Sequence, residues 1–380
     1  MQELFQGITN FGWQNLVMFI IAGVLIYLAI AKEYEPMLLL PIGFGAILAN
    51  IPLSAAISSK AGEEGFLHVL YNAGIANELF PVLIFIAVGA MIDFKPLLQN
   101  PFMLFFGAAA QFGIFATMML ALALGFDLLD AASIGIIGAA DGPTSIYVAQ
   151  RFAHGDVNLV GPISVAAYSY MSLVPIIQPP VIKLLTSRSE RMIRMDYRQV
   201  KVHKLVEILF PIMITIVAGI LAPISVSLVG SLMFGNLIRA CGVLDRLSET
   251  AQKELANLVT LLLGITIGST MVAGNFLRRE TLLIMAMGLV AFIFDTAGGV
   301  IFAKILNIFL KHKVNPMVGA AGISAFPMSA RVIQRIAKEE DPTNFILMQS
   351  ISANVAGQLG SIVAGGMILA LVPYFFSLIK

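Results

Sequence analysis

Charged residues are scarce in this 380-residue sequence. Asp, Glu, Lys and Arg together make up 12% of the chain, whereas 58% of the residues are hydrophobic. Soluble globular domains carry about 25% charged residues, so a soluble protein could not cover its surface with this composition. The composition therefore predicts an integral membrane protein.

Several chemical classes are excluded by what the sequence lacks. The single cysteine, Cys241, permits no intrachain disulfide and no zinc site built from thiolates. A net charge of +1 builds no basic face, which argues against nucleic acid as a partner. The GxGxxG, GxxxxGK[ST] and HExxH patterns are absent from the sequence, which argues against nucleotide-driven pumping by this chain.

Long apolar runs are abundant instead. About twenty apolar residues cross a bilayer as a helix, and the runs predict an all-α polytopic membrane protein with about eleven or twelve transmembrane helices. The final run is long enough for more than one helix. The expected spans are 13–31, 36–53, 79–93, 102–125, 131–150, 159–182, 206–222, 224–244, 256–274, 281–310, 313–333 and 344–379.

A basic connector, residues 186–205, divides the chain in two. The positive-inside rule predicts that it is cytoplasmic. Four basic residues recur at helical spacing and predict a short amphipathic helix: Arg191, Arg194, Arg198 and Lys201. This helix could rest on anionic membrane lipids as an orientation signal, or it could be a docking surface for a cytoplasmic partner.

The two halves, 1–185 and 206–380, resemble each other. GAADGPTSIYVAQRFAHGD (138–156) and GAAGISAFPMSARVIQRIAKEED (319–341) both begin with GAA, contain proline and reach Gln-Arg. We therefore predict two membrane repeats with a broken or re-entrant helix in each, at 138–150 and 315–331. Such interrupted repeats indicate a transporter binding site. We expect the repeats to be inverted, which requires an odd number of crossings in each half.

Asp141 is the strongest candidate for a functional residue. An ionisable side chain at membrane depth is costly and is a functional candidate by default. Gly142 and Pro143 break the helix beside it and free backbone carbonyls. With the hydroxyls of Thr144 and Ser145, this set suits sodium, or a proton that competes for the same carboxylate. The alternative is that Asp141 only caps the half-helix that starts near Pro143.

The second interruption, NPMVGAAGISAFPMSAR (315–331), offers a complementary set. Asn315 and Ser324 supply neutral oxygens, Gly319 permits close approach of the backbone, and a proline breaks the helix. Arg331 could lie near Asp141, pair with an anionic ligand, or mark the aqueous boundary.

Polar residues occur at matched places further along both halves. Tyr170 in AAYSYMSLVPIIQPP corresponds to Asn354 in SANVAGQLGS, and the pair suits two related cation sites. An interfacial position for Tyr168 and an interhelical hydrogen bond for Asn354 are the simpler alternatives. Asp295, which lies in the middle of a span, is a weaker candidate than Asp141.

Three segments carry a family resemblance that extends over essentially the whole chain. GAADGPTSIYVAQ, VAAYSYMSLVPIIQPP and NPMVGAAGISAFPMSAR, in this order, resemble the β subunits of the sodium-pumping, biotin-dependent carboxylic acid decarboxylases. This family includes the oxaloacetate, methylmalonyl-CoA and glutaconyl-CoA enzymes.

The resemblance implies a function for the chain. It would decarboxylate carboxybiotin and couple this step to Na+ export with consumption of a proton. Its implied location is the bacterial cytoplasmic (inner) membrane. The implied partners are a biotin carrier subunit, a soluble carboxyltransferase α subunit and a small single-span membrane subunit, in an oligomeric assembly.

The resemblance also assigns roles to residues. Asp141 would bind Na+ in alternation with a proton, and Tyr170 and Ser324 would join the coupling path. Asn315 and Gly319 would shape the ion site, and Arg331 would support it or meet the carboxybiotin. The alternative function is a stand-alone secondary transporter, such as a Na+/H+ exchanger or an organic-anion symporter, which would share the repeats, the broken helices and the intramembrane aspartate.

Overall fold

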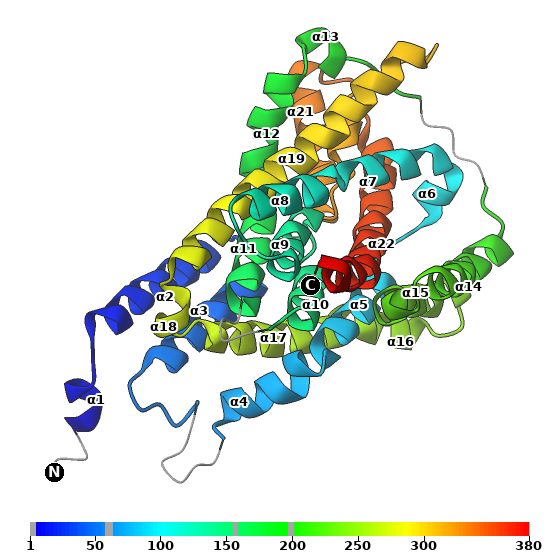
Figure 1. Ribbon diagram of the computed structural model, residues 1–380. Coiled ribbons are helices and arrows are strands. Elements are labelled where there is room, and N and C mark those ends of the chain that lie inside the picture. Colours follow the sequence, from blue (N-terminus) through cyan, green and yellow to red (C-terminus); the bar gives the residue numbers. More distant parts are fainter. Residues whose placement is uncertain (1–4, 58–63, 155–158, 197–200, 380) are drawn as a thin grey trace.

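The computed structural model describes residues 5–57, 64–154, 159–196 and 201–379, and within these ranges the chain forms helices and no β-strand. The predicted all-helical class is therefore confirmed for the described part of the chain. Figure 1 shows the helices crossing at steep angles rather than standing as a parallel bundle.

One group of helices comes from the N-terminal third and the middle of the chain. The helices of this group pack in pairs, α2 on α3, α3 on α17, α5 on α15 and α14 on α15. Their bounds are α2 (Trp13–Ala31), α3 (Pro36–Asn50), α5 (Leu79–Met91), α14 (Lys204–Leu221), α15 (Val226–Cys241) and α17 (Ala256–Thr270).

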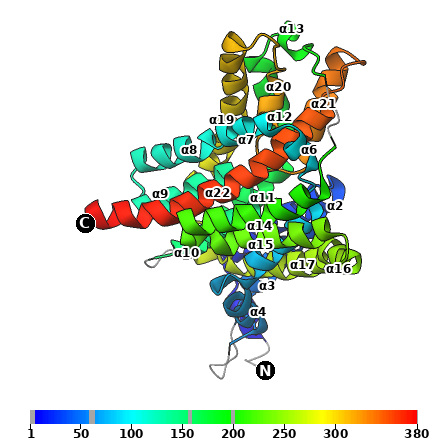
Figure 2. The same cartoon turned by 90° about the vertical axis from the view of Figure 1, so that its right-hand side faces the viewer.

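A second group carries both predicted interruptions. Figures 1 and 2 show α12, α21 and the C-terminal part of α19 at the end of the molecule that carries α13, whereas the N-terminus and α4 lie at the opposite end. The bounds are α7 (Leu104–Ala110), α8 (Phe112–Ala123), α9 (Leu128–Gly135), α10 (Gly142–Arg151), α11 (Val160–Ser172), α12 (Val174–Leu185), α19 (Arg279–Phe309), α20 (Met317–Ala320), α21 (Met328–Glu340) and α22 (Leu347–Ile379).

Short helical segments connect these elements. They are α1 (Gln6–Thr9), α4 (Phe66–Leu70), the π-helix η2 (Tyr71–Ala76), α6 (Lys95–Gln99), α13 (Arg188–Arg191), α16 (Asp245–Thr250), the π-helix η6 (Ala251–Leu255), α18 (Ala273–Phe276), and the 3₁₀ turns η3 (Pro101–Met103), η4 (Ile136–Ala139) and η5 (Pro223–Ser225).

Fewer described helices qualify as membrane spans by length and composition than the sequence predicts, so the predicted number of eleven or twelve is not confirmed. Six helices of the described chain are long and apolar enough to cross a membrane, and two bent pairs raise the number to eight. Four expected spans are left out of this number. The spans 131–150 and 313–333 contain the interruptions, and α3 and α17 are helices of only 15 residues. The expected span 159–182 is one of the two bent pairs, with a bend of 67° between α11 and α12, where Pro175 follows the break. The final run forms the single helix α22.

The connector also differs from the prediction. Only Arg188–Arg191 are helical, and the described residues that follow Met192 are extended or irregular. The prediction of an amphipathic helix is therefore wrong for the described part of the connector. Arg198 lies outside the described residues. The cause is tertiary, because Arg191 and Arg194 bond to acidic residues at the end of α21.

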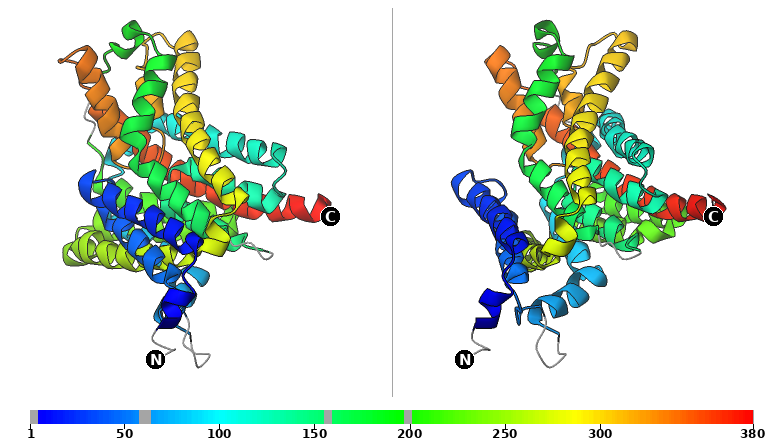
Figure 3. Two further views of the ribbon diagram at one scale, coloured as in Figure 1. Left: turned by 90° about the vertical axis from the view of Figure 1, so that its left-hand side faces the viewer. Right: turned by 60° about the vertical axis from the view of Figure 1, so that its left-hand side comes forward.

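Glycine permits the tight crossing of α3 and α17. A Cβ at Gly268 would overlap the carbonyl oxygen of Ile42, and a Cβ at Gly45 would overlap that of Ile265. The two backbones therefore touch, as is typical where small residues line a helix crossing in a membrane. Figure 3 shows α2 and α3, drawn in blue, in the lower part of the molecule, whereas α13 and α21 lie at its upper end.

We predict that Gly268→Ala lowers the stability of the protein. The added methyl group must push α17 away from α3, and overpacking of this kind costs about 1–3 kcal/mol. The measurement is the midpoint of thermal unfolding in detergent. Gly23→Ala is the matched control, because a Cβ at Gly23 has no atom within 4 Å in the described structure. Equal midpoints for the two variants would contradict the tight crossing.

Candidate functional site

The first interruption places Asp141 between two half-helices. α9 continues into the 3₁₀ turn η4, Ala140 then adopts φ 53°, and Asp141 adopts an extended conformation before α10 starts at Gly142. Pro143 lies in the first turn of α10, where its missing N–H leaves no gap in the hydrogen bonding. The sequence GAADGP thus ends one half-helix and starts the next.

The Asp141 carboxylate is buried and held on one side. Its exposed fraction is 5%, and three groups lie within hydrogen-bond distance of Oδ2: Thr144 Oγ1 at 2.6 Å, Gln358 Nε2 at 3.3 Å and Ser361 Oγ at 3.3 Å. The carboxylate thus contacts side chains of both α10 and α22, which is more than a capping role alone requires.

The second interruption presents Ser324 between α20 and α21. Ser324 Oγ donates to the carbonyl oxygen of Gly357 on α22 at 2.9 Å. Asn354 Nδ2, one turn earlier on α22, donates to the carbonyl oxygen of Ile323 at 2.5 Å. Two hydrogen bonds between α22 and the unwound segment, one in each direction, thus hold this segment in place.

A buried glutamine secures the same segment from the other side. Gln178 Nε2 on α12 donates to the carbonyl oxygen of Ala320 at 2.9 Å, and Ser329 Oγ donates to Gln178 Oε1 at 3.0 Å. The carbonyls that an interrupted helix frees need partners when no water is present. Side chains of α12 and α22 supply those partners.

Asp141 and Ser324 line one cavity of about 210 Å³. The cavity lies between the two groups of helices, because α3, α5 and α17 contribute one wall and the interrupted helices the other. Its described lining consists of Glu35, Leu38, Ile84, Val88, Met91, Ala140, Asp141, Pro143, Tyr168, Met171, Thr260, Ser324, Phe326 and Gln358. The structure therefore brings the two predicted interruptions to one site.

Gln358 and Ser361 are polar residues of this site that the sequence analysis does not name as candidates. Gln358 and Ser361 share a face of α22 with Asn354, since the spacings of four and three residues place them one above another. That polar stripe on an apolar helix is the signal that could have found them. Tyr168 is 5% exposed and its ring lies against Gly142, so the structure does not support the alternative of an interfacial position.

Two of the other predicted residues lie away from the cavity but inside the helix packing. Tyr170 Oη donates to the carbonyl oxygen of Met285 on α19 at 2.6 Å. Gly319 packs directly on Gly299, where a Cβ would overlap the carbonyl oxygen of the partner glycine. Both residues fix α19 against the interrupted helices and do not face Asp141 across the cavity.

Asn315 and Arg331 lie further out. Asn315 is fully buried, and its Nδ2 donates to the carbonyl oxygens of Arg191 and Ile193 at 2.8 and 2.9 Å. Asn315 thus ties the connector to the start of α20. Arg331 is exposed, and its guanidinium has no hydrogen-bond or ion-pair partner among the described residues.

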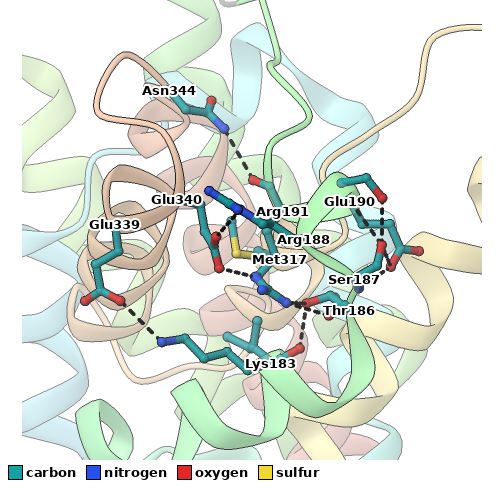
Figure 4. Close-up of polar contacts among 12 residues, drawn as sticks. Lys183, Thr186, Ser187, Arg188, Glu190, Arg191, Met317, Glu339, Glu340 and Asn344 are labelled. Atoms are coloured by element: carbon teal, nitrogen blue, oxygen red, sulfur yellow. Dashed lines mark hydrogen bonds and ion pairs between the residues drawn. The ribbon is translucent and has the colours of Figure 1, made fainter.

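The connector end is held by a charged network, shown in Figure 4. Arg191 Nε donates to Glu340 Oε1 at 2.7 Å, and its Nη1 donates to the carbonyl oxygen of Thr186 at 2.5 Å. The side chains of Arg191 and Glu340 are only 12% and 15% exposed. Arg188 reaches the other oxygen of Glu340 at 3.3 Å but is 73% exposed. Arg191 is therefore the main residue that joins the start of the connector to the end of α21.

Asp127, at the start of α9, and His154, just after the end of α10, contact each other. His154 Nε2 lies 2.7 Å from Asp127 Oδ2, and its Nδ1 lies 2.8 Å from the carbonyl oxygen of Phe152. The bond to Phe152, followed by the interaction with Asp127, raises the pKa of His154. Ligand atoms of His154, Asp127 and Asp130 lie within 4.8 Å of one another, but both ring nitrogens already have these partners.

Asp295 is separate from this site. It is 1% exposed, and neither carboxylate oxygen has a hydrogen-bond partner among the described residues. It packs against Gly113 of α8, where a Cβ would overlap Oδ1. Asp295 is not among the described residues that line the cavity of Asp141.

The fold and the site define a multi-pass membrane protein with a buried carboxylate at the crossing of two interrupted helices, as in ion-translocating proteins. Comparison with known proteins identifies the class further. The family described as the Na+-transporting oxaloacetate decarboxylase beta subunit matches residues 14–372.

Curated relatives of the chain are subunits of three kinds of decarboxylase. The methylmalonyl-CoA decarboxylase subunit beta of Veillonella parvula is 50% identical over 366 residues, which cover 96% of this chain and 95% of the relative. The glutaconyl-CoA decarboxylase subunit beta of Acidaminococcus fermentans is 49% identical with the same coverage. The oxaloacetate decarboxylase beta chain of Klebsiella pneumoniae is 42% identical over 423 aligned positions, which cover 96% of this chain and 97% of the relative.

This chain belongs to the family of β subunits of the Na+-transporting decarboxylases. The comparisons thus support the decarboxylase interpretation over the stand-alone transporter.

We predict that Arg191→Gln destabilises the protein more than Arg188→Gln. Loss of Arg191 leaves the half-buried carboxylate of Glu340 without its closest partner, at a cost of about 1.5–3 kcal/mol. Loss of the exposed Arg188 should cost about 0–1 kcal/mol. The midpoints of thermal unfolding in detergent test the order, and a larger effect of Arg188→Gln would contradict it.

Proposed function

We propose that this chain decarboxylates carboxybiotin and couples this step to Na+ export, with consumption of a proton. The observation that carries the proposal is the placement of Asp141 and Ser324 on one cavity. The family resemblance supplies the reaction, and the site supplies oxygen ligands for a hard monovalent cation.

The hydrogen bonding of Asp141 supports a role in binding Na+. Thr144, Gln358 and Ser361 hold the carboxylate at Oδ2, and Asp141 lines the cavity in which a cation could reach it. Ser324 contributes a hydroxyl oxygen to the same cavity. The carbonyl ends of η4 and the segment before α21 add partial negative charge at the interruptions. We propose Asp141 and Ser324 as direct Na+ ligands.

The remaining predicted residues would act indirectly. Asn354 holds the Ile323 carbonyl next to Ser324, and Asn315 and Gly319 fix α20. Tyr170 would couple the site to α19 through Met285. Each of these residues therefore contributes to the geometry of the interruption in which the ion would lie.

Exchange of Na+ for a proton at Asp141 would link transport to decarboxylation. Apolar surroundings favour the neutral form of a carboxyl group, and a bound cation favours the ionised form. The cavity offers an apolar wall, with Leu38, Ile84 and Val88 among its lining residues. Loss of CO₂ from carboxybiotin consumes one proton, which a protonated Asp141 could supply as Na+ replaces it. Arg331, exposed and without a described partner, is the cation proposed to meet the carboxybiotin.

The proposed assembly follows the resemblance. A biotin carrier subunit would bring carboxybiotin, a soluble carboxyltransferase α subunit would load it, and a small single-span subunit would complete the membrane part. α14 supports contact with lipid or further subunits, because only 6% of its apolar window is buried. We place the chain in the bacterial cytoplasmic membrane as two inverted repeats, 1–185 and 206–380, with the connector on the cytoplasmic side.

We further propose that the substrate of the complex is a CoA ester. Identity is 47–50% to the subunits of CoA-ester decarboxylases and 42–43% to the oxaloacetate decarboxylase chains. The alignment to the Klebsiella pneumoniae chain spans 423 positions for the 380 residues of this chain, so the longer relatives contain segments that this chain lacks.

We predict that Asp141→Asn abolishes Na+-dependent decarboxylation by the reconstituted complex, because an amide oxygen carries no charge for Na+ and cannot exchange a proton. Carboxyl transfer to biotin should remain unchanged. The measurement is ²²Na+ uptake by inside-out vesicles together with the release of CO₂. Asp93→Asn is the control, since Asp93 lies outside the described cavity lining and bonds to the backbone of Lys95. Normal Na+ transport by Asp141→Asn would refute the proposal.

The substrate proposal has its own test. Purified from its natural source with all subunits, the complex should decarboxylate methylmalonyl-CoA or glutaconyl-CoA at least about tenfold faster than oxaloacetate, a preference worth about 1.4 kcal/mol in the transition state. Na+-stimulated CO₂ release from each acid measures it. A higher rate with oxaloacetate would contradict the proposal, because it would show that sequence identity between β subunits does not predict the substrate of the complex.

A further inference from the structure

A second carboxylate lines the cavity of Asp141. Glu35, in the loop between α2 and α3, is half-buried and belongs to the same cavity lining. Its neighbours Lys32 and Glu33 are exposed, so this loop marks the end of the cavity that is nearest to water. Asp141 lies on the interrupted helix at the opposite wall. The cavity thus has one carboxylate at its outer end and one inside.

The side chain of Glu35 makes no polar contact with the described residues. Glu35 occupies the N-cap position of α3, but its side chain makes no capping hydrogen bond. It also has no ion-pair or hydrogen-bond partner among the described residues. The backbone carbonyl is different, because it accepts bonds from the N–H groups of Leu38 and Leu39, both at 3.0 Å. The backbone is therefore fixed, whereas the carboxylate of this cavity-lining residue has no described partner.

The backbone of Glu35 is held in an unfavourable conformation. Its φ of 37° and ψ of 60° lie in the left-handed region, which residues with a Cβ rarely adopt. Pro36 follows directly and restricts the conformation of Glu35 further. Such strain persists where the surroundings impose it, and it is concentrated at functional sites.

The surroundings of Glu35 offer a carboxylate no compensating charge. The cavity lining contains no Lys, Arg or His among its described residues, and it includes the apolar side chains of Leu38 and Met91. Burial raises the pKa of Glu35. A cation next to the carboxylate would offset this loss of solvation.

We propose that Glu35 is the cation-capture residue at the outer end of the cavity, which binds Na+ transiently on its way to or from Asp141. This proposal rests on the proposed function of Asp141. In this proposal Glu35 raises the local concentration of Na+ at the cavity, and Asp141 exchanges Na+ for a proton. A negative charge at the entrance of a cavity with apolar walls raises the local concentration of a cation and its rate of binding.

The test is the Na+ concentration that gives half-maximal decarboxylation by the complete complex in vesicles, with choline chloride holding the ionic strength constant. Glu35→Gln should raise this concentration about threefold to tenfold, as expected for the loss of one partly screened charge, and should keep the maximal rate within about twofold. Glu35→Asp, which keeps the charge on a shorter side chain, should shift it less.

Glu33→Gln is the matched control. Glu33 lies in the same loop, also has a positive φ of 55°, and is exposed outside the described cavity lining. It should leave half-saturation unchanged. An equal shift in Glu33→Gln would show a general effect of loop charge and overturn the proposal. An unchanged half-saturation in Glu35→Gln, or a loss of maximal rate alone, would overturn it as well.

Asp141→Asn in the same series separates the two proposals. If Asp141→Asn loses the Na+ dependence while Glu35→Gln behaves like the wild type, only the role of Glu35 fails. If Asp141→Asn keeps the Na+ dependence, the proposed function fails whatever Glu35 does. Should Glu35→Gln not assemble, Glu35→Asp decides the matter. A half-saturation concentration that is raised above that of Glu33→Gln supports the proposal, and one that is not raised above it overturns the proposal.

Discussion

The burial of the Asp141 carboxylate is the constraint on which the rest of the site depends. A charged or even polar group in an apolar interior is costly unless other groups bond to it. Three side chains from α10 and α22 meet this need at Oδ2. They can do so only because the helix is interrupted at Ala140 and because α22 crosses directly beside the interruption. The break in the helix and the long α22 are therefore parts of one arrangement.

The same need for hydrogen-bond partners explains the second interruption. Unwinding the chain before α21 frees carbonyl groups that lipid cannot satisfy. Gln178 and Asn354 donate to two of them, at Ala320 and Ile323. These amides come from α12 and α22, which follow the first and the second interruption in the chain. Each half of the protein thus supplies one amide that holds the same unwound segment.

Much of the site could be predicted from the sequence because its residues are chemically out of place. Asp141 stands in an apolar run next to Gly-Pro, and Ser324 lies in a segment with glycines and a proline. Gln358 and Ser361 gave a weaker signal, since single polar residues on apolar helices commonly serve helix packing. Glu35 gave no signal, because a glutamate in a loop beside other charged residues is typical of any interface. Tyr170 and Asn315 were predicted near the ion but contact α19 and the connector instead.

The membrane class, the helical fold and the positions of both interruptions were determined by the sequence itself. Composition and proline chemistry act locally, through solvation of the chain and through hydrogen bonds within a few residues. Tertiary structure alone decided that the interruptions share one cavity, that Glu35 lines it, and that the connector is pinned to α21 instead of forming a basic helix. These outcomes depend on how helices cross, and a crossing is set by contacts between residues that are more than a hundred positions apart, such as Asp141 and Gln358 or Arg191 and Glu340.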